Sequence, residues 1–257
     1  MIYKTLIYQK MGAVGIITLN RPAVDNAIDR QLAEELTDIC TDIDHDEETR
    51  VVIITGAGNK AFSVGTDLNE LSSTAGDNQE TKLLSVATPM ASLKIPAIAA
   101  INGDALGQGL ELALACDLRI AVETAHFALP YVGSGLIPWD GATQRLPRLI
   151  DKAKAMEMVL TGRTVDAIEA YQTGLVNKVV SSDELIPTAT DMGKSMTSKA
   201  IWAMMYIKEA IHKGLDLTLE QGLRLEADLY FLLHTTEDRT EGIKALLEKR
   251  PPHFKGK

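Results

Sequence analysis

The residues whose types and spacing favour chemistry lie between positions 101 and 117, INGDALGQGLELALACD. Three glycines, Gly103, Gly107 and Gly109, precede an apolar run that carries one acid, Glu111. Glycine allows positive φ and close approach, and the apolar run predicts a buried helix. Free N–H groups at a helix start stabilise negative charge, so Glu111 is a candidate general base beside such a site. The alternative is a simple glycine turn with a glutamate that only favours the helix dipole.

A second segment, FSVGTDL at 62–68, has the same design of a buried strand, a glycine turn and a helix start. Each segment therefore offers one backbone N–H. Two such groups that converge form an oxyanion hole, which stabilises charge that develops on a carbonyl oxygen. Neither segment reads G-x-G-x-x-G or carries the Lys-Ser/Thr of a phosphate loop, so dinucleotide and phosphate-loop binding are not indicated.

Composition narrows the class of protein. The 257 residues are 46% hydrophobic and 24% charged, which indicates one large domain or one domain with a small appendage. A net charge of −9 disfavours nucleic-acid binding, which depends on cationic side chains. Cys40 and Cys116 fall in apolar helical patterns and are expected to be buried free thiols of a reducing compartment. His126 and His253 are isolated, so no metal site is predicted.

The sequence also predicts the cellular compartment of the protein. The N-terminus lacks the pattern of a signal or transit peptide, and no apolar run reaches the length of about 18 residues that a membrane span needs. We expect a cytoplasmic protein that neither crosses nor anchors in a membrane.

The elements that must position these residues follow a repeating order. Residues 3–9 and 13–19 predict a hairpin, and a helix capped by Asp25 or Asn26 is expected through residues 31–46. Buried strands, a surface loop and later helices are predicted in turn: strands at 51–58, 96–103, 117–123 and 175–180, a helix starting near Asp67, a loop at 72–81, and mostly helices after Asp151. Strands that alternate with helices indicate an α/β fold.

Several motifs now resemble one family. FSVGTDLNEL is similar to its F-x-x-G-A-D-x-x-E-x segment, and INGDALGQGLELALACDLRIA to its I-N-G-x-A-x-G-G-G-x-E-L-A-x-x-C-D-x-x-x-A segment. Further matches are LNRP, PWDGATQRLPRLI, TGRTVDAIEAYQTGLVNKVV and LLEKRPPHFKGK. They follow the family's order from end to end, and the chain is identified as resembling the enoyl-CoA hydratase/isomerase (crotonase) superfamily.

This resemblance implies a crotonase-type spiral of β-β-α repeats over residues 1–197, which holds the acyl-CoA site, and a C-terminal helical trimerisation region over residues 198–257. It implies homotrimers, or hexamers that are dimers of trimers. The substrate is an acyl-CoA, with coenzyme A as part of the substrate and no separate cofactor. Its thioester oxygen would lie between the backbone N–H groups of Thr66 and Gln108, where the family usually has Ala and Gly.

The catalytic pattern departs from the family at one point. Glu111 matches the first of the two glutamates that hydratases use to activate water, and its first-turn position favours the ionised form. Tyr131 takes the place of the second glutamate. A phenol has a reference pKa of about 10 against about 4.3 for Glu, so Tyr131 is a proton donor and a poor base.

Asp140 is a second candidate for the missing acid–base role. Some family members carry an Asp eight residues beyond the second glutamate position; here Trp139 falls there and Asp140 lies one further. The alternative is that Asp140 caps the helix that follows. Trp139 is expected to line the acyl pocket, especially for a flat ring.

The resemblance also implies coenzyme A contacts, which are less specific. The matching residues for the adenine and pantetheine are Ala23, Val24, Asp25, Val64, Gly65, Asp67 and Gly107. Lys249 and Lys257, with Lys255, are candidates for contacts to the phosphates, within one chain or across a subunit interface. An exposed basic tail that is only solvated is the alternative.

We therefore expect a hydratase-type lyase that adds water to an unsaturated acyl-CoA, with a cyclic or conjugated acyl group suiting the altered second site. The main alternative is an acyl-CoA double-bond isomerase. Other crotonase-type reactions, namely decarboxylation and thioester or C–C hydrolysis, stay open. Non-catalytic binding of CoA esters or RNA is a further alternative of a different class.

Overall fold

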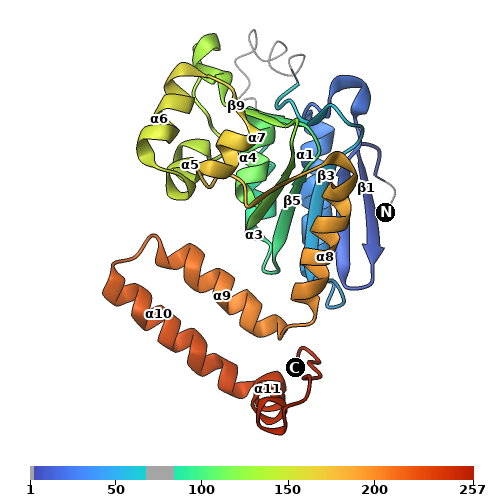
Figure 1. Ribbon diagram of the computed structural model, residues 1–257, viewed down its shortest axis with the longest axis vertical. Coiled ribbons are helices and arrows are strands. Elements are labelled where there is room, and N and C mark those ends of the chain that lie inside the picture. The colour runs from blue at the N-terminus through green and yellow to red at the C-terminus, as the bar shows by residue number, and fades with distance from the viewer. Residues whose placement is uncertain (1–2, 68–83) are drawn as a thin grey trace.

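The computed structural model describes residues 3–67 and 84–257, and within them the strands form two sheets (Figure 1). The larger sheet has the order β1 (Leu6–Met11), β2 (Val14–Leu19), β3 (Val51–Gly56), β5 (Ala97–Ile101), β7 (Leu118–Val122) and β10 (Lys178–Val180). The β1–β2 pair is antiparallel and the pairs from β2 onward are parallel. Every residue of β3 and β5 is buried, as expected of apolar runs in a sheet covered on both faces.

The smaller sheet carries the segments that lead to the candidate site. Its order is β4 (Ala61–Ser63), β6 (Asp104–Leu106), β8 (His126–Ala128) and β9 (Val165–Asp166). Strand β6 was not predicted, because the sequence indicated that the preceding strand runs directly into the glycine turn. Since β4 and β6 pair in parallel, the residues that follow them emerge at the same edge of this sheet.

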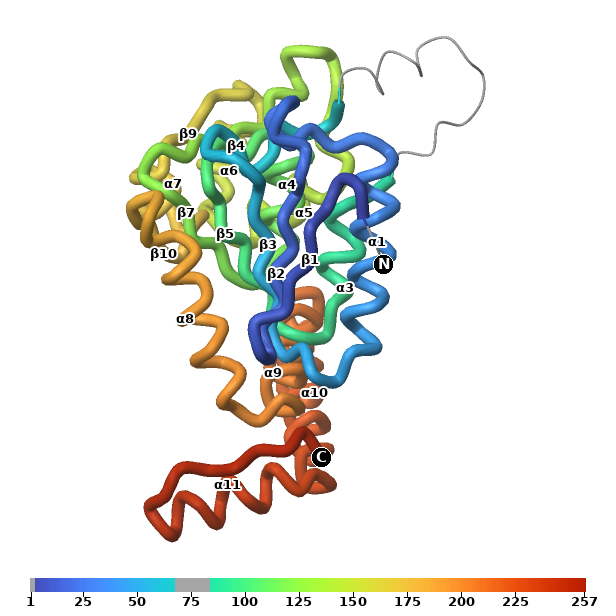
Figure 2. Tube along the Cα trace, turned by 90° about the vertical axis from the view of Figure 1, so that its right-hand side faces the viewer, coloured from blue at the N-terminus to red at the C-terminus, as the bar shows by residue number. Residues whose placement is uncertain are grey.

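Helices cover both faces of the larger sheet. Figure 2 shows α8 (Leu185–Thr197) on one side and α1 (Arg30–Asp44) with α3 (Ala87–Ser92) on the other. The other helical segments in the described residues are η1 (Pro22–Val24), α4 (Gln108–Ala115), η2 (Pro130–Ser134), α5 (Ala142–Leu149), α6 (Lys152–Thr161), α7 (Ala167–Gln172), η3 (Ser182–Glu184), α9 (Ile201–Gly214), α10 (Leu219–Leu232), η4 (Leu233–Thr235) and α11 (Glu237–Glu248). The mixed α/β fold is as expected, and all eight residues of α4 are buried.

The start of α1 differs from the prediction. Its cap is Asp29, whose side chain accepts a hydrogen bond from the Leu32 N–H at 2.8 Å. Asp25 and Asn26 have left-handed φ values of 51° and 55° after η1. The buried Asn26 amide instead donates to the carbonyls of Ala57 and Ala61, contacts across 31 and 35 positions of the chain that no local pattern reveals.

Helices α9 to α11 form an arm that extends away from the two sheets (Figures 1 and 2). Asp117, at the start of β7, ties this arm to the core, because its carboxylate accepts from Lys208 Nζ at 2.8 Å and lies 2.9 Å from His212 Nε2. The same carboxylate accepts from the N–H of Ala97 on β5.

Two further expectations concern residues that the structure describes. Cys40 and Cys116 are buried free thiols, as predicted. Among the described residues, no helix combines the length and the apolar character that crossing a membrane requires. The helix expected from Asp67 and the loop expected at 72–81 lie largely outside the described ranges.

Candidate active site

Two glycines bring the segment after β4 against the start of α4. A Cβ on Gly65, which has φ +92°, would lie 2.8 Å from the carbonyl oxygen of Leu106 and 3.0 Å from the N of Gln108. A Cβ on Gly109 would lie 2.3 Å from the carbonyl oxygen of Ser63. Real side chains do not fit at these distances, so glycine at both positions is what permits the approach.

The approach places two free backbone donors at the junction. Hydrogen bonds of the Ile28–Thr66 bridge run through the Gly65 carbonyl and the Asp67 N–H, which leaves the Thr66 N–H out of the ladder. Gln108 is the first residue of α4, so its N–H has no intrahelical partner. Within residues 3–67 and 84–257, neither N–H donates to an acceptor.

Glu111 lies in the first turn of α4 and is fully buried. Its Oε1 accepts from the backbone N–H groups of Asp140 and Ala142, both at 2.9 Å, and its Oε2 accepts from the Tyr131 hydroxyl at 2.5 Å. Burial raises the pKa of Glu111 above its usual value, although the bonds from Tyr131 and Ala142 oppose the shift. The first-turn position predicted an ionised Glu111, whereas its burial shifts the pKa toward the protonated form.

Tyr131 lies in η2 and its hydroxyl faces Glu111. Burial, together with the negative charge of Glu111, raises the pKa of the Tyr131 phenol far above its ordinary value. The phenol therefore stays protonated and acts as a donor. A Cβ on Gly107 would lie 3.6 Å from the Tyr131 oxygen, so Gly107 borders the same space.

The Asp140 carboxylate is hydrogen-bonded to groups other than Glu111. Its buried carboxylate accepts from the N–H groups of Val86 and Ala87, at 2.9 and 3.2 Å, and from the Ser85 hydroxyl. Only its backbone N–H contacts Glu111. The alternative that Asp140 caps the following helix is wrong, because α5 begins after Gly141 without a side-chain cap; the carboxylate holds the start of α3 instead.

The Gln108 side chain is a feature that the sequence did not reveal. It is 1% exposed. Its Oε1 accepts from Thr66 Oγ1 at 2.9 Å, and its Nε2 donates to Asp140 Oδ2 at 3.1 Å and to the Leu84 carbonyl at 3.2 Å. The one signal in the sequence was that positions 66 and 108 carry Thr and Gln, where the family usually has Ala and Gly. That difference indicated a role for these two side chains without saying which role.

Two of the segments predicted to contact coenzyme A lie side by side. The Val64 N–H donates to the Asp25 carbonyl at 3.2 Å, and the Ile28 N–H donates to the Gly65 carbonyl at 2.7 Å. Ala23 and Val24 are exposed in η1. Asp67 pairs with Arg21, at 3.1 Å, and Trp139 is half-buried immediately before Asp140.

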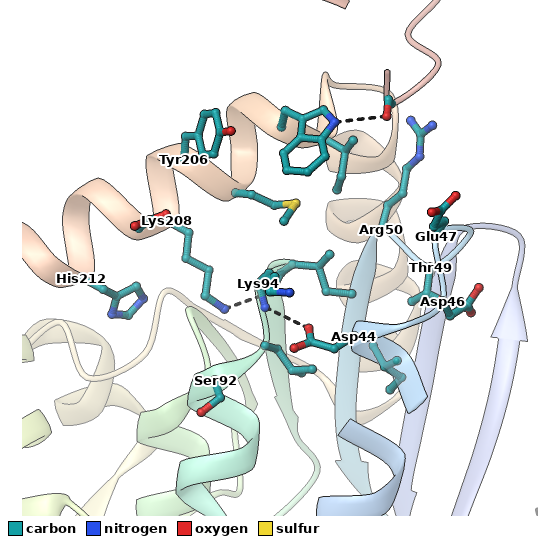
Figure 3. Close-up of a pocket in the computed structure, with 18 of the residues that line it drawn as sticks. Asp44, Asp46, Glu47, Thr49, Arg50, Ser92, Lys94, Tyr206, Lys208 and His212 are labelled. Atoms are coloured by element: carbon teal, nitrogen blue, oxygen red, sulfur yellow. Dashed lines mark hydrogen bonds between the residues drawn. The ribbon is translucent and has the colours of Figure 1, made fainter. Parts of the chain in front are cut away.

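The predicted basic contacts lie elsewhere in the chain. Lys249 follows α11 and Lys257 lines a cavity of about 980 Å³ beside α9 and the residues that precede β3 and β5. Figure 3 shows Lys208 reaching from α9 toward that cavity. In Figures 1 and 2 α11 lies at the far end of the molecule from α4, so a single chain does not bring these two lysines to Glu111.

The described residues contain no group of three or more His, Cys, Asp or Glu side chains placed to hold a metal ion. The site is built instead from backbone donors, one buried carboxylate and one phenol. Such an arrangement can stabilise a developing oxyanion and move a proton beside it.

Comparison with known proteins shows the family of the chain. The family model for enoyl-CoA hydratase/isomerase matches residues 9–257, and the chain belongs to this family. It is 40% identical over 255 residues to the probable enoyl-CoA hydratase echA8 of Mycobacterium tuberculosis, which covers 99% of each chain. It is 37% identical over 257 residues to the crotonyl-CoA hydratase of Syntrophomonas wolfei, again covering 99% of both.

Solved structures resemble the fold equally closely. The crystal structure of an enoyl-CoA hydratase from Bacillus anthracis superposes with a TM-score of 0.92 at 41% identity and covers 99% of this chain and 100% of that one. The α/β architecture expected from the motifs is therefore confirmed.

Proposed function

We propose that this protein adds water across the double bond of an enoyl-CoA. The observation that carries the proposal is the position of Glu111, a buried carboxylate one helical turn from the free Gln108 N–H. The relatives named as enoyl-CoA hydratases support the same reaction class.

The reaction needs one base and one oxyanion site. The thioester oxygen accepts from the N–H groups of Thr66 and Gln108. Glu111 takes a proton from water as the water oxygen bonds to Cβ, and the electron pair of the double bond moves through Cα to the thioester oxygen. When the enolate collapses, the Glu111 carboxyl returns that proton to Cα, so the net change is the addition of one water.

Tyr131 supports Glu111 in this scheme. Its hydroxyl donates to Glu111 Oε2, which stabilises the ionised carboxylate and orients it. Because the phenol stays protonated, it does not compete as a base. One carboxylate then serves as base and acid in turn, which removes the need for a second glutamate.

Further proposals concern binding and assembly. Coenzyme A would lie along Ala23–Asp25 and 64–67, which the backbone bonds bring together, and Trp139 would line the acyl pocket for a cyclic or conjugated group. Lys249 and Lys257 would reach coenzyme A phosphates of another subunit. We place the protein in the cytoplasm as a homotrimer or hexamer, with residues 1–197 as the spiral core and residues 198–257 as the assembly region.

The test is turnover of crotonyl-CoA and a cyclohexenyl-CoA thioester in ¹⁸O-labelled water. We expect the hydroxyacyl product to carry the label. Replacing Glu111 with Gln removes the base and is expected to lower kcat at least about 100-fold. The same substitution at the exposed Glu123 is the matched control and is expected to leave kcat unchanged. Full activity of the Glu111→Gln variant would remove Glu111 from the mechanism.

Double-bond isomerisation is the second candidate, and the replacement of the second carboxylate by Tyr131 favours it. A single carboxylate can take a proton from Cα and return it to Cγ without water. A 3-enoyl-CoA supplied to the wild type separates the two activities. Formation of the 2-enoyl isomer, without labelled oxygen in any product, would replace hydration by isomerisation.

A further inference from the structure

We propose that the side chains of Thr66, Gln108 and Asp140 are positioning residues that tie both oxyanion donors to Glu111. This inference rests on the proposed function, because it concerns how the same site keeps its geometry. The observation is one continuous set of hydrogen bonds that starts on the segment after β4, crosses α4 and ends at the catalytic carboxylate.

The first link joins the two donor-bearing residues directly. Thr66 Oγ1 donates to Gln108 Oε1 at 2.9 Å. Backbone packing at Gly65 already presses the two segments together, and this bond adds a side-chain connection between residues 42 positions apart. A shift of either segment would stretch it, so the bond resists changes in the distance between the two N–H groups.

The second link determines which way the Gln108 amide faces. Its Nε2 donates to the Asp140 carboxylate and to the Leu84 carbonyl, both of which only accept. A flipped amide would turn its oxygen toward these acceptors and leave Thr66 without one. The Gln108 amide thus has one favourable orientation. In that orientation its oxygen, Oε1, is the acceptor for the Thr66 hydroxyl.

The third link connects Gln108 to Glu111, the proposed base, through the carboxylate and the backbone N–H of Asp140. The Asp140 carboxylate accepts from Gln108, while the Asp140 N–H donates to Glu111 Oε1 at 2.9 Å. Val86, Ala87 and Ser85 hold the same carboxylate from the start of α3. Asp140 is therefore held through both its carboxylate and its backbone N–H. The hydrogen bonds of the carboxylate are made to donors of the protein itself.

None of these side-chain groups needs to touch the substrate. Gln108 and Asp140 are 1% and 5% exposed, and Thr66 directs its hydroxyl to Gln108. These side chains instead determine where the two backbone N–H donors lie. Small displacements of such donors lower the rate of the chemical step strongly. This predicts an effect on kcat larger than the effect on KM.

The test compares variants that differ in one hydroxyl or one amide. Thr66→Val keeps the shape and removes the donor, and Gln108→Ala removes the amide; we expect each to lower kcat about tenfold and to change KM less than about threefold. Thr66→Ser restores the hydroxyl and is expected to stay within about threefold of wild type. Thr37→Val, an exposed hydroxyl deletion on α1, is the matched control.

A spectroscopic readout separates this inference from the proposed function. Butyryl-CoA labelled with ¹³C at the carbonyl has no double bond to hydrate, and hydrogen bonds to its oxygen lower the carbonyl stretching frequency. We expect a downshift on binding to wild type and a smaller one in Thr66→Val and Gln108→Ala. An unshifted band in wild type would refute the oxyanion hole itself. A wild-type downshift that both variants retain, with unchanged kcat, would refute the positioning role alone.

The double variant tests whether the residues act through their shared bond. If they do, Thr66→Val in the Gln108→Ala background lowers kcat no further than Gln108→Ala alone. Losses that multiply, about 100-fold in the double variant, would refute the link. If Gln108→Ala proves unstable, the comparison of Thr66→Val with Thr66→Ser still tests whether the Thr66 hydroxyl contributes to kcat: equal kcat values would refute its positioning role.

Discussion

At the residue scale, Glu111 is subject to opposing effects. Burial favours the protonated carboxyl, and three hydrogen bonds to its oxygens favour the carboxylate. The net effect raises its pKa, which suits a group that must take a proton and give it back in one catalytic cycle. An exposed glutamate would release the proton to water too readily for the second step.

The raised pKa predicts a pH dependence of stability. In the unfolded chain Glu111 has a pKa of about 4.3, so between that value and its higher folded value the folded protein holds more protons. Its contribution to stability is full below the unfolded pKa and is lost as pH rises through the folded one. Relative to wild type, Glu111→Gln should therefore gain free energy of unfolding from pH 4 toward neutral pH.

Urea unfolding of both proteins across this range measures the difference. Glu123→Gln changes the same chemical group at an exposed position, and its curve should run parallel to wild type. A curve for Glu111→Gln that is also parallel to wild type throughout would contradict the shift.

At the element scale, the corrected start of α1 gives a stability prediction. Asp29→Ala removes the cap on the Leu32 N–H and also the ion pair with Arg21. Loss of such a cap costs about 1 kcal/mol, which for a chain of this length lowers the unfolding midpoint by about 2 °C or somewhat more. Asp38→Ala, on an exposed face within the same helix, should leave the midpoint nearly unchanged. Equal midpoints for both variants would argue against the cap, and differential scanning fluorimetry measures them.

The elements show which features a sequence pattern can predict. The hairpin, the buried strands and the first-turn position of Glu111 depend on neighbours within a few residues, so local periodicity and glycine spacing were sufficient. The Asp140 carboxylate meets residues more than 50 positions away, and the Gln108 amide meets Asp140 across 32. Such pairings depend on how the strands and helices pack, and a single sequence holds no local signal for them.

At the scale of the whole molecule, the arm of α9 to α11 exposes many large apolar side chains. They include Ile211, Leu215, Leu219, Leu223, Phe231, Leu246 and Leu247. Such a concentration of exposed large apolar side chains on one part of a chain is typical of an interface. It supports the proposed trimer and gives the arm a reason to extend away from the sheets.

A charge within this surface should prevent assembly. Phe231 is 66% exposed on α10, and Phe231→Asp would bury a carboxylate against a neighbouring subunit. Sedimentation velocity should show a trimer or hexamer for wild type and a monomer for the variant. Thr37→Asp adds the same charge on the exposed side of α1 and should assemble as wild type does. A wild-type protein that sediments as a monomer would overturn the proposed assembly.

The buried Gln108 amide also limits the use of family consensus residues for engineering this chain. Replacing unusual residues by their family counterparts commonly stabilises a protein, and the counterpart here is glycine. In this chain that replacement would leave the Thr66 hydroxyl without its acceptor and remove one donor from Asp140. Because the Thr66 hydroxyl donates to the Gln108 amide, consensus design would have to change positions 66 and 108 together.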